Sequence, residues 1–136
     1  MTAAERQNAI VERINGFGDC FEQYSYLILL SGQLPAMPGE LKTEENRVEG
    51  CQSVVWVSTR RRDGRLRVFA DSDTLILRGV LSLIAEIADG APCGELAELE
   101  LDLLDRTDLG LVFRSERLTG IGHIWRRIRD AARSDS

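Results

Sequence analysis

The first third of the chain carries apolar residues every three or four positions, which is the spacing of one helix face. Thr2 and Glu5 form a capping box ahead of the first apolar stripe, and Gly16 ends that stripe. Asp19 is an N-cap residue ahead of a second stripe, and Gly32 is its natural C-terminal residue. The pattern therefore predicts two helices, which a proline-containing extended connection follows.

Alternation of apolar and polar residues in the middle of the chain predicts a β-hairpin. Residues 54–59 are mostly β-branched or aromatic, and apolar residues alternate again after the Asp63-Gly64 pair. An Asp-Gly pair is a strong signal for a two-residue turn between antiparallel strands. That turn fixes a register in which Val54 lies opposite Asp73.

Three helical stretches are expected after the hairpin. Asp71-Ser72-Asp73 offers N-cap residues for a helix that ends near Gly90 and is apolar on nearly every side, so we expect it inside the fold. One or two short helices are expected within 95–104, and an amphipathic helix within 118–132. With a weaker strand at 46–50, the chain is predicted to be α+β, with a small antiparallel three-stranded sheet packed against helices from both ends of the chain.

Length and composition narrow the function classes. The 136 residues fit one domain spanning 1–136, and 43% hydrophobic residues supply one core. A net charge of -5 argues against a nucleic-acid partner, because proteins that bind nucleic acid usually present a basic face. The longest apolar runs are too short to cross a bilayer, and the first residues lack the pattern of a secretory signal. We therefore expect a cytoplasmic protein that binds neither nucleic acid nor membrane.

The three cysteines are expected to remain thiols in that compartment. Their spacing fits no standard zinc site and the chain has a single histidine, so we expect no metal centre. Cys20, at the start of the second helix, and Cys93, in a Pro-Cys-Gly turn, are interpreted as packing residues. His123 is interpreted as a residue at the boundary of the apolar face of the last helix.

Cys51 has surroundings that suit a reactive thiol. Because it lies three residues before Val54, the hairpin register brings it to the sheet end where Asp71, Asp73 and the start of the buried helix also arrive. A helix N-terminus favours a thiolate, whereas a nearby carboxylate opposes it or accepts its proton. Gly50 leaves the sulfur accessible. From these residues alone, a nucleophile and a small buried packing cysteine both remain open.

The residues around Cys51 also resemble those of a known family. Glu-Gly-Cys-Gln-Ser-Val-Val-Trp at 49–56, Asp-Ser-Asp at 71–73 and Arg-Gly at 78–79 are similar to the motifs of the SufE family of sulfur acceptors. The resemblance extends over essentially the whole chain and implies a SufE/IscU-like fold. It also implies roles for three residues: Cys51 as the persulfide acceptor, Asp73 as a modulator of the Cys51 loop, and Arg117 as a docking residue.

The resemblance further implies a division of labour between proteins. A PLP-dependent cysteine desulfurase of the SufS type would supply the sulfur, so PLP belongs to that partner and this chain binds no cofactor. The chain would stimulate the desulfurase and pass sulfur to a SufB-containing scaffold for iron–sulfur cluster assembly. It would act as a monomer or weak dimer and as a carrier rather than an independent enzyme, by the logic of thiol–disulfide exchange.

Two other functions remain open. A SufE-like paralogue of the CsdE kind would use the same chemistry to deliver sulfur to tRNA or to another cofactor pathway. A stand-alone redox-active thiol protein would instead reduce peroxide through Cys51, with Cys20 or Cys93 resolving the sulfenic acid. The sequence shows no close cysteine pair, which disfavours the redox function.

One motif departs from the family. The family usually has Ser-Pro-Ser-Arg-x-x-Gly-Leu near the last helix, whereas residues 114–121 keep only Arg117, Gly120 and an aliphatic residue. The change falls at a helix start near the docking face, so it bears on which desulfurase the chain serves.

The loop that carries Cys51 is expected to move. A persulfide is easily reduced or oxidised, so a carrier benefits from shielding its sulfur between transfers. We therefore expect the resting loop to shield Cys51 from water, with Gly50 as a hinge and Asp73 helping to keep the loop closed.

Overall fold

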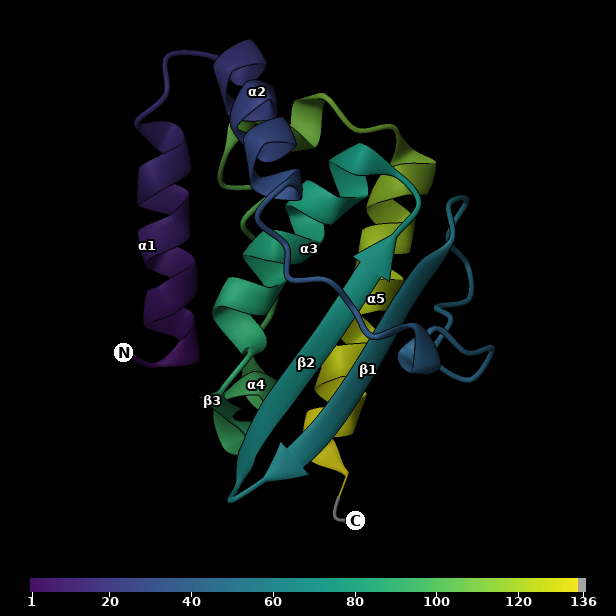
Figure 1. Ribbon diagram of the computed structural model, residues 1–136. Helices are drawn as coiled ribbons and strands as arrows, with labels where there is room; N and C mark the ends of the chain where they lie inside the picture. Colours follow the sequence, from purple (N-terminus) through teal and green to yellow (C-terminus); the bar gives the residue numbers. More distant parts are fainter. Residues whose placement is uncertain (135–136) are drawn as a thin grey trace.

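The computed structural model describes residues 1–134. Within that part of the chain, five α-helices and three strands follow one another with two short 3-10 helices (Figure 1). Their order is α1 (Ala3–Asn15), α2 (Cys20–Ser31), η1 (Gly39–Leu41), β1 (Val55–Arg62), β2 (Arg65–Ser72), α3 (Leu75–Ala88), β3 (Ala91–Pro92), α4 (Cys93–Glu98), η2 (Asp108–Leu111) and α5 (Ser115–Arg133).

The first two helices begin where their capping residues predict. The Thr2 hydroxyl accepts a hydrogen bond from the Glu5 amide at 3.0 Å, and the Glu5 carboxylate accepts one from the Thr2 amide at 2.8 Å. Asp19 accepts from the Glu22 amide at 2.9 Å at the start of α2. These bonds use backbone donors that a helix N-terminus would otherwise leave unpaired, which is why the local sequence suffices to place both starts.

The hairpin has the predicted register. Arg62 pairs with Arg65 across the turn, and Val55 pairs with Ser72 at the other end. One step further, the Asp73 amide donates to the Val54 carbonyl at 3.2 Å. The segment that carries Cys51 therefore meets the end of β2, far from the turn.

The predicted strand at 46–50 is wrong. The third strand is β3, which pairs antiparallel with the start of β2. Residues 46–50 make only an isolated bridge at Arg47, opposite Trp56. Pairing stops there because Gly50 adopts a left-handed backbone (φ +83°) in a turn that takes the chain away from β1.

Two details of the later helices also differ from expectation. Thr74 is the N-cap of α3, without a side-chain capping bond, because β2 continues through Ser72 and leaves Asp71 too early to cap the helix. The short helix α4 ends at Glu98, so residues 99–104 are not helical. α3 ends near Gly90 as predicted, and α5 contains the predicted stretch 118–132 but begins earlier, at Ser115.

The helices pack mainly on one face of the hairpin (Figure 1). α3 lies against β2 and α5 against β1, α1 and α2 pack on α3, and the connection from α2 to η1 crosses the hairpin in the foreground. The interior is continuous and includes eight residues of α3, as the nearly uniform apolar pattern of that helix predicts. None of the helices in residues 1–134 is both long and apolar enough to span a membrane.

Gly79 permits a close approach of α3 to the backbone of α2. A Cβ atom at this position of α3 would lie 2.3 Å from the carbonyl oxygen of Leu27 on α2, and 2.9 Å from its carbonyl carbon. Both contacts are with backbone, so no side-chain rotation relieves them.

Gly79→Ala is therefore expected to destabilise the fold by about 2 kcal/mol, because overpacking against backbone should cost about 3 kcal/mol, the upper end of the usual range, while the better helix propensity of alanine returns about 1 kcal/mol. Urea unfolding followed by circular dichroism measures the change. Gly122→Ala in α5 is the matched control, since a methyl group added there would meet no atom within 4 Å and the substitution should be neutral or stabilising. Equal stability changes in the two variants would contradict the close crossing.

Candidate functional site

Cys51 lies on the loop that precedes β1 in the sequence. In space, this loop lies between the end of β2 and the first half of α5. The Cys51 side chain is half-buried and packs against the core, and its Sγ donates a weak hydrogen bond to the Gly120 carbonyl at 3.4 Å. A small, mostly apolar hollow beside Sγ is lined in part by Leu77 and Ile121. The loop thus shields the sulfur only in part, which is less than the sequence-based expectation of a sulfur largely shielded from water.

Burial sets the protonation of the Cys51 thiol. Burial raises its pKa above the ordinary 9.0, and the positive charge of Arg117 opposes that shift without cancelling it. The resting loop therefore holds Cys51 mainly as a thiol near neutral pH. Since the thiolate is the nucleophile, this upward shift of the pKa lowers the reactivity of the sulfur near neutral pH.

The alkylation rate of Cys51 by iodoacetamide should therefore keep rising through pH 9, by about tenfold per pH unit below the midpoint. Arg117→Ala should move that midpoint further upward, because it removes the charge that favours the thiolate. Mass spectrometry of the alkylated protein on both sides of pH 9 measures the profile. A midpoint below that of the same cysteine in the urea-unfolded chain would contradict it.

The residues that come after Cys51 in the sequence form a hydrogen-bond network with Arg117 and Asp73. Arg117 donates to the Ser53 hydroxyl at 3.0 Å, and the Thr74 and Ser53 hydroxyl oxygens lie 2.7 Å apart, within hydrogen-bond distance. The Asp73 carboxylate accepts from the Val54 amide at 3.2 Å and from the Thr74 hydroxyl at 3.1 Å. The structure thus brings together the three residues that the resemblance singles out, Cys51, Asp73 and Arg117.

Asp71, two residues before Asp73, is the common partner of two ion pairs. It is 5% exposed, and it accepts from the Ser72 amide at 2.8 Å, from Arg78 Nη1, and from Lys42 Nζ at 3.0 Å. Burial alone would raise its pKa, but the hydrogen bonds from Lys42 and Ser72 and the charge of Arg78 outweigh burial and lower the pKa. Asp71 therefore ties β2 to α3 and to the segment before the Cys51 loop, rather than capping α3.

Sequence reasoning missed two residues that contact the loop. The imidazole of His123 lies against Gly50, and Arg127 donates to the backbone carbonyls of Glu45 and Arg47. His123 is half-buried, in agreement with its interpretation as a boundary residue, but its neighbour is the Cys51 loop. The spacing of Arg117, Gly120, His123 and Arg127 along one helix side was the available signal.

The other cysteines lie elsewhere. The Cys93 amide donates to the Gly64 carbonyl at 2.9 Å, which puts Cys93 at the turn of the hairpin. The length of β2, about 25 Å at roughly 3.3 Å per residue, separates this end from the Cys51 loop. Cys93 is buried, and Cys20 begins α2. Cys93 is therefore too distant to resolve a sulfenic acid on Cys51, and residues 1–134 contain no cluster of three or more metal-ligating side chains.

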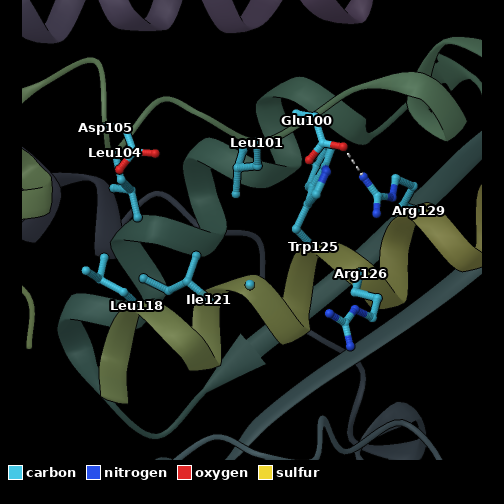
Figure 2. A pocket seen from close by; sticks show the side chains of 10 residues that line it. Glu100, Leu101, Leu104, Asp105, Leu118, Ile121, Trp125, Arg126 and Arg129 are labelled. Atoms are coloured by element: carbon cyan, nitrogen blue, oxygen red, sulfur yellow. Dashed lines mark hydrogen bonds and ion pairs between the residues drawn. The ribbon is translucent and has the colours of Figure 1, made fainter. Parts of the chain in front are cut away.

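The altered motif at 114–121 still starts α5. The helix begins at Ser115, with Arg114 as an N-cap that makes no side-chain capping bond. On the side of α5 away from the Cys51 loop, a groove of about 320 Å³ lies between α5 and the segment 100–105. Figure 2 shows Trp125 and Arg129 on its wall, with Arg129 bonded to Glu100 at 2.8 Å. Ile121 separates this groove from the hollow beside Cys51.

Sequence comparisons show which proteins this chain is similar to. The family model described as "SufE: Fe-S metabolism associated domain" matches residues 8–132. The sulfur acceptor protein CsdE of Escherichia coli is 34% identical over 102 residues, which cover 74% of this chain and 69% of CsdE. An uncharacterized SufE-like protein of Rhizobium meliloti is 33% identical over 116 residues, covering 82% of this chain and 83% of that protein. The chloroplastic quinolinate synthase of Arabidopsis thaliana is 31% identical over 104 residues, which are only 14% of its length.

A comparison of folds points the same way. The solution structure of a hypothetical protein from Thermus thermophilus superposes with a TM-score of 0.80 at 18% identity, covering 94% of this chain and 93% of that one. At that identity the likeness concerns the fold alone, whereas the family match spans nearly the entire sequence. The family match and the relatives together show that this chain, with its α+β fold, is a member of the SufE family of sulfur-transfer proteins.

Proposed function

We propose that this protein accepts sulfur as a persulfide on Cys51 from a PLP-dependent cysteine desulfurase of the SufS type. The observation that carries the proposal is the position of Cys51, a half-buried thiol on a loop beside Arg117 and Asp73. The family membership and the CsdE relative, a sulfur acceptor, support it. In this proposal PLP belongs to the desulfurase, and the chain is a carrier that stimulates the desulfurase by removing its product.

The transfer is a displacement at sulfur. The Cys51 thiolate attacks the outer sulfur of the desulfurase persulfide, a new S–S bond forms on Cys51, and the S–S bond of the donor breaks. The donor cysteine leaves as a thiolate and takes up the proton that Cys51 lost, so one thiol and one persulfide are present before and after. The step needs no external oxidant or reductant.

The surface around Cys51 suits docking of a partner protein. Leu75 at the start of α3 is 53% exposed, Leu111 is 80% exposed, and Tyr24 contributes to a shallow hollow next to Gln52. Exposed apolar side chains of this size mark interaction surfaces when they gather, and Arg117 and Asp73 add charges that fix orientation. Docking on this face would displace the loop and expose the thiol.

Delivery to a SufB-containing scaffold for iron–sulfur cluster assembly, in the cytoplasm, completes the proposal. The description of the matched family as Fe-S metabolism associated supports that destination. A CsdE-like paralogue that feeds tRNA or another cofactor pathway would load Cys51 in the same way. Pull-down of the loaded protein, followed by transfer of labelled sulfur to each purified acceptor, separates the two destinations.

The loading step is tested with the purified protein, a SufS-type desulfurase and cysteine. Mass spectrometry of alkylated peptides should find added sulfur atoms on the peptide that contains Cys51. A variant with both Cys20→Ser and Cys93→Ser should load equally well. Added sulfur on Cys20 or Cys93, with Cys51 unmodified, would contradict the proposal.

Asp73→Arg should loosen the Cys51 loop and accelerate alkylation of Cys51 at neutral pH by about three- to tenfold, the change expected from losing one or two hydrogen bonds that hold the closed loop. The rate with iodoacetamide in the protein alone measures the opening. Asp130→Arg on the exposed surface of α5 is the control, since the charge change is the same. If wild-type Cys51 reacts as fast as a free thiol and Asp73→Arg leaves the rate unchanged, the loop is already open.

A further inference from the structure

α5 carries a stripe of residues that contacts the Cys51 loop along its length. Arg117, Gly120, His123 and Arg127 are three or four positions apart, so they share one side of the helix. This side lies next to the buried stripe of Ile121, Ile124 and Ile128 that faces the core. The loop from Glu45 to Ser53 is therefore laid along the helix rather than projecting from it.

The two ends of this loop are tied to α5 by arginines. Arg127 donates through Nη1 to the Arg47 carbonyl at 2.9 Å and through Nη2 to the Glu45 carbonyl. Arg117 donates to the Ser53 hydroxyl at 3.0 Å. Because Arg127 binds backbone carbonyls, its contact fixes the course of the chain whatever the side chains of Glu45 and Arg47 do.

The middle of the loop is held by close packing on the same stripe. A Cβ at Gly50 would lie 2.7 Å from Cδ2 and 2.8 Å from Nε2 of His123, so the imidazole occupies the space that any other residue would need. One turn before His123, α5 has Gly120, where a Cβ would lie 3.3 Å from the Cys51 sulfur. The absence of a side chain at both glycines lets the loop and the helix approach each other.

We propose that His123 and Arg127 are positioning residues that hold the Cys51 loop closed against α5 until the partner docks. The proposal rests on Cys51 being the sulfur acceptor, but the contacts themselves are independent of sulfur chemistry. A closed loop reduces the fraction of molecules competent to receive sulfur, and the apparent affinity for the donor falls by the same fraction. Residues outside the acceptor motif thus set how readily the carrier opens.

His123→Ala and Arg127→Ala should each accelerate alkylation of Cys51 in the isolated protein by about three- to tenfold, since the rate follows the equilibrium between closed and open loops. Arg126→Ala is the matched control: Arg126 is the adjacent residue on the same helix, and Figure 2 shows it on the side with the groove. It should alkylate at the wild-type rate. Wild-type rates in both His123→Ala and Arg127→Ala would overturn the proposal.

Kinetic measurements with the desulfurase distinguish a variant with a looser loop from a variant that folds poorly. A looser loop should lower the KM for this protein by about the factor by which alkylation rises, with kcat nearly unchanged. A variant that merely folds poorly would show a higher KM, and that result in both variants would also overturn the proposal. If wild-type protein takes no sulfur, the proposed function fails, whereas the alkylation rates still decide whether the loop is held.

A double-mutant cycle tests the contact between His123 and Gly50 directly. Gly50→Ala should accelerate alkylation more in the wild-type background than in His123→Ala, because the added methyl group meets the imidazole only when the ring is present. The left-handed backbone at Gly50 strains alanine equally in both backgrounds, so it cancels in the comparison. Equal acceleration in the two backgrounds would show that the ring does not hold the loop.

Discussion

Replacing Cys51 by serine should abolish sulfur loading and the stimulation of the desulfurase. A serine hydroxyl forms no S–S bond with the donor sulfur, and Cys93 cannot take its place because it lies at the opposite end of the hairpin. We expect at least about a hundredfold less transferred sulfur, as for other enzymes and carriers that lose their nucleophile. The quantity to measure is labelled sulfur bound per protein molecule, together with the rate of alanine release by the desulfurase.

Two controls show that the loss is chemical. Cys51→Ser should keep its stability within about 1 kcal/mol, because the side chain is half-buried and serine can still donate to the Gly120 carbonyl. It should also still bind the desulfurase, which competition against the wild-type protein measures. Stimulation of the desulfurase at the wild-type level by Cys51→Ser would mean that this chain activates its partner without carrying sulfur.

The hairpin shows what local sequence can predict about the site. Asp63-Gly64 fixes the turn, the turn fixes the register, and the register brings the segment before β1 to the end of β2. The position of the Cys51 segment at the Asp73 end of β2 is therefore predictable without any knowledge of the helices. The prediction succeeds because each step depends on residues that are close in sequence.

The parts that the sequence did not predict depend on distant partners. β3 is only two residues long, Ala91 and Pro92, and no periodicity marks a strand so short. Asp71 looked like a capping residue because its partner Lys42 lies almost thirty positions earlier and leaves no local trace. The contact of α5 with the loop joins segments about seventy positions apart, so the apolar pattern of α5 predicted its buried face but not its second contact surface.

Asp71 links the stability of the fold to the position of the site. Its carboxylate joins Lys42, whose ammonium group also lies 5.2 Å from the centre of the Trp56 ring, to Arg78 on α3, which donates to the Ser31 carbonyl at 3.3 Å. The ends of α2 and β2 and the segment before the Cys51 loop are thus held through one buried charge. A neutral residue there leaves two cations without their counter-charge.

Asp71→Asn is expected to lower the free energy of unfolding by about 2–3 kcal/mol at pH 7, somewhat less than the 3–5 kcal/mol typical of a broken buried ion pair. The reduction follows from the exposure of the cations, since the side chains of Lys42 and Arg78 are 34% and 27% exposed and can regain water. Urea unfolding at pH 7 measures the loss. Asp130→Asn, an exposed change of the same kind, should stay within about 0.5 kcal/mol of wild type.

The same variant has a defined dependence on pH. The pKa of Asp71 is lowered in the folded protein from 3.8, so its charge contributes stability that is fully present above that value and is lost as the pH falls through the lower, folded pKa. The difference in stability between wild type and Asp71→Asn should therefore be constant near neutral pH and shrink once the pH drops below about 3.8. A difference that persists undiminished in strong acid would mean that the asparagine disturbs packing rather than charge. A difference that vanishes near pH 5 would mean that the carboxylate is protonated too early to be paired with Arg78 and Lys42 as the structure shows.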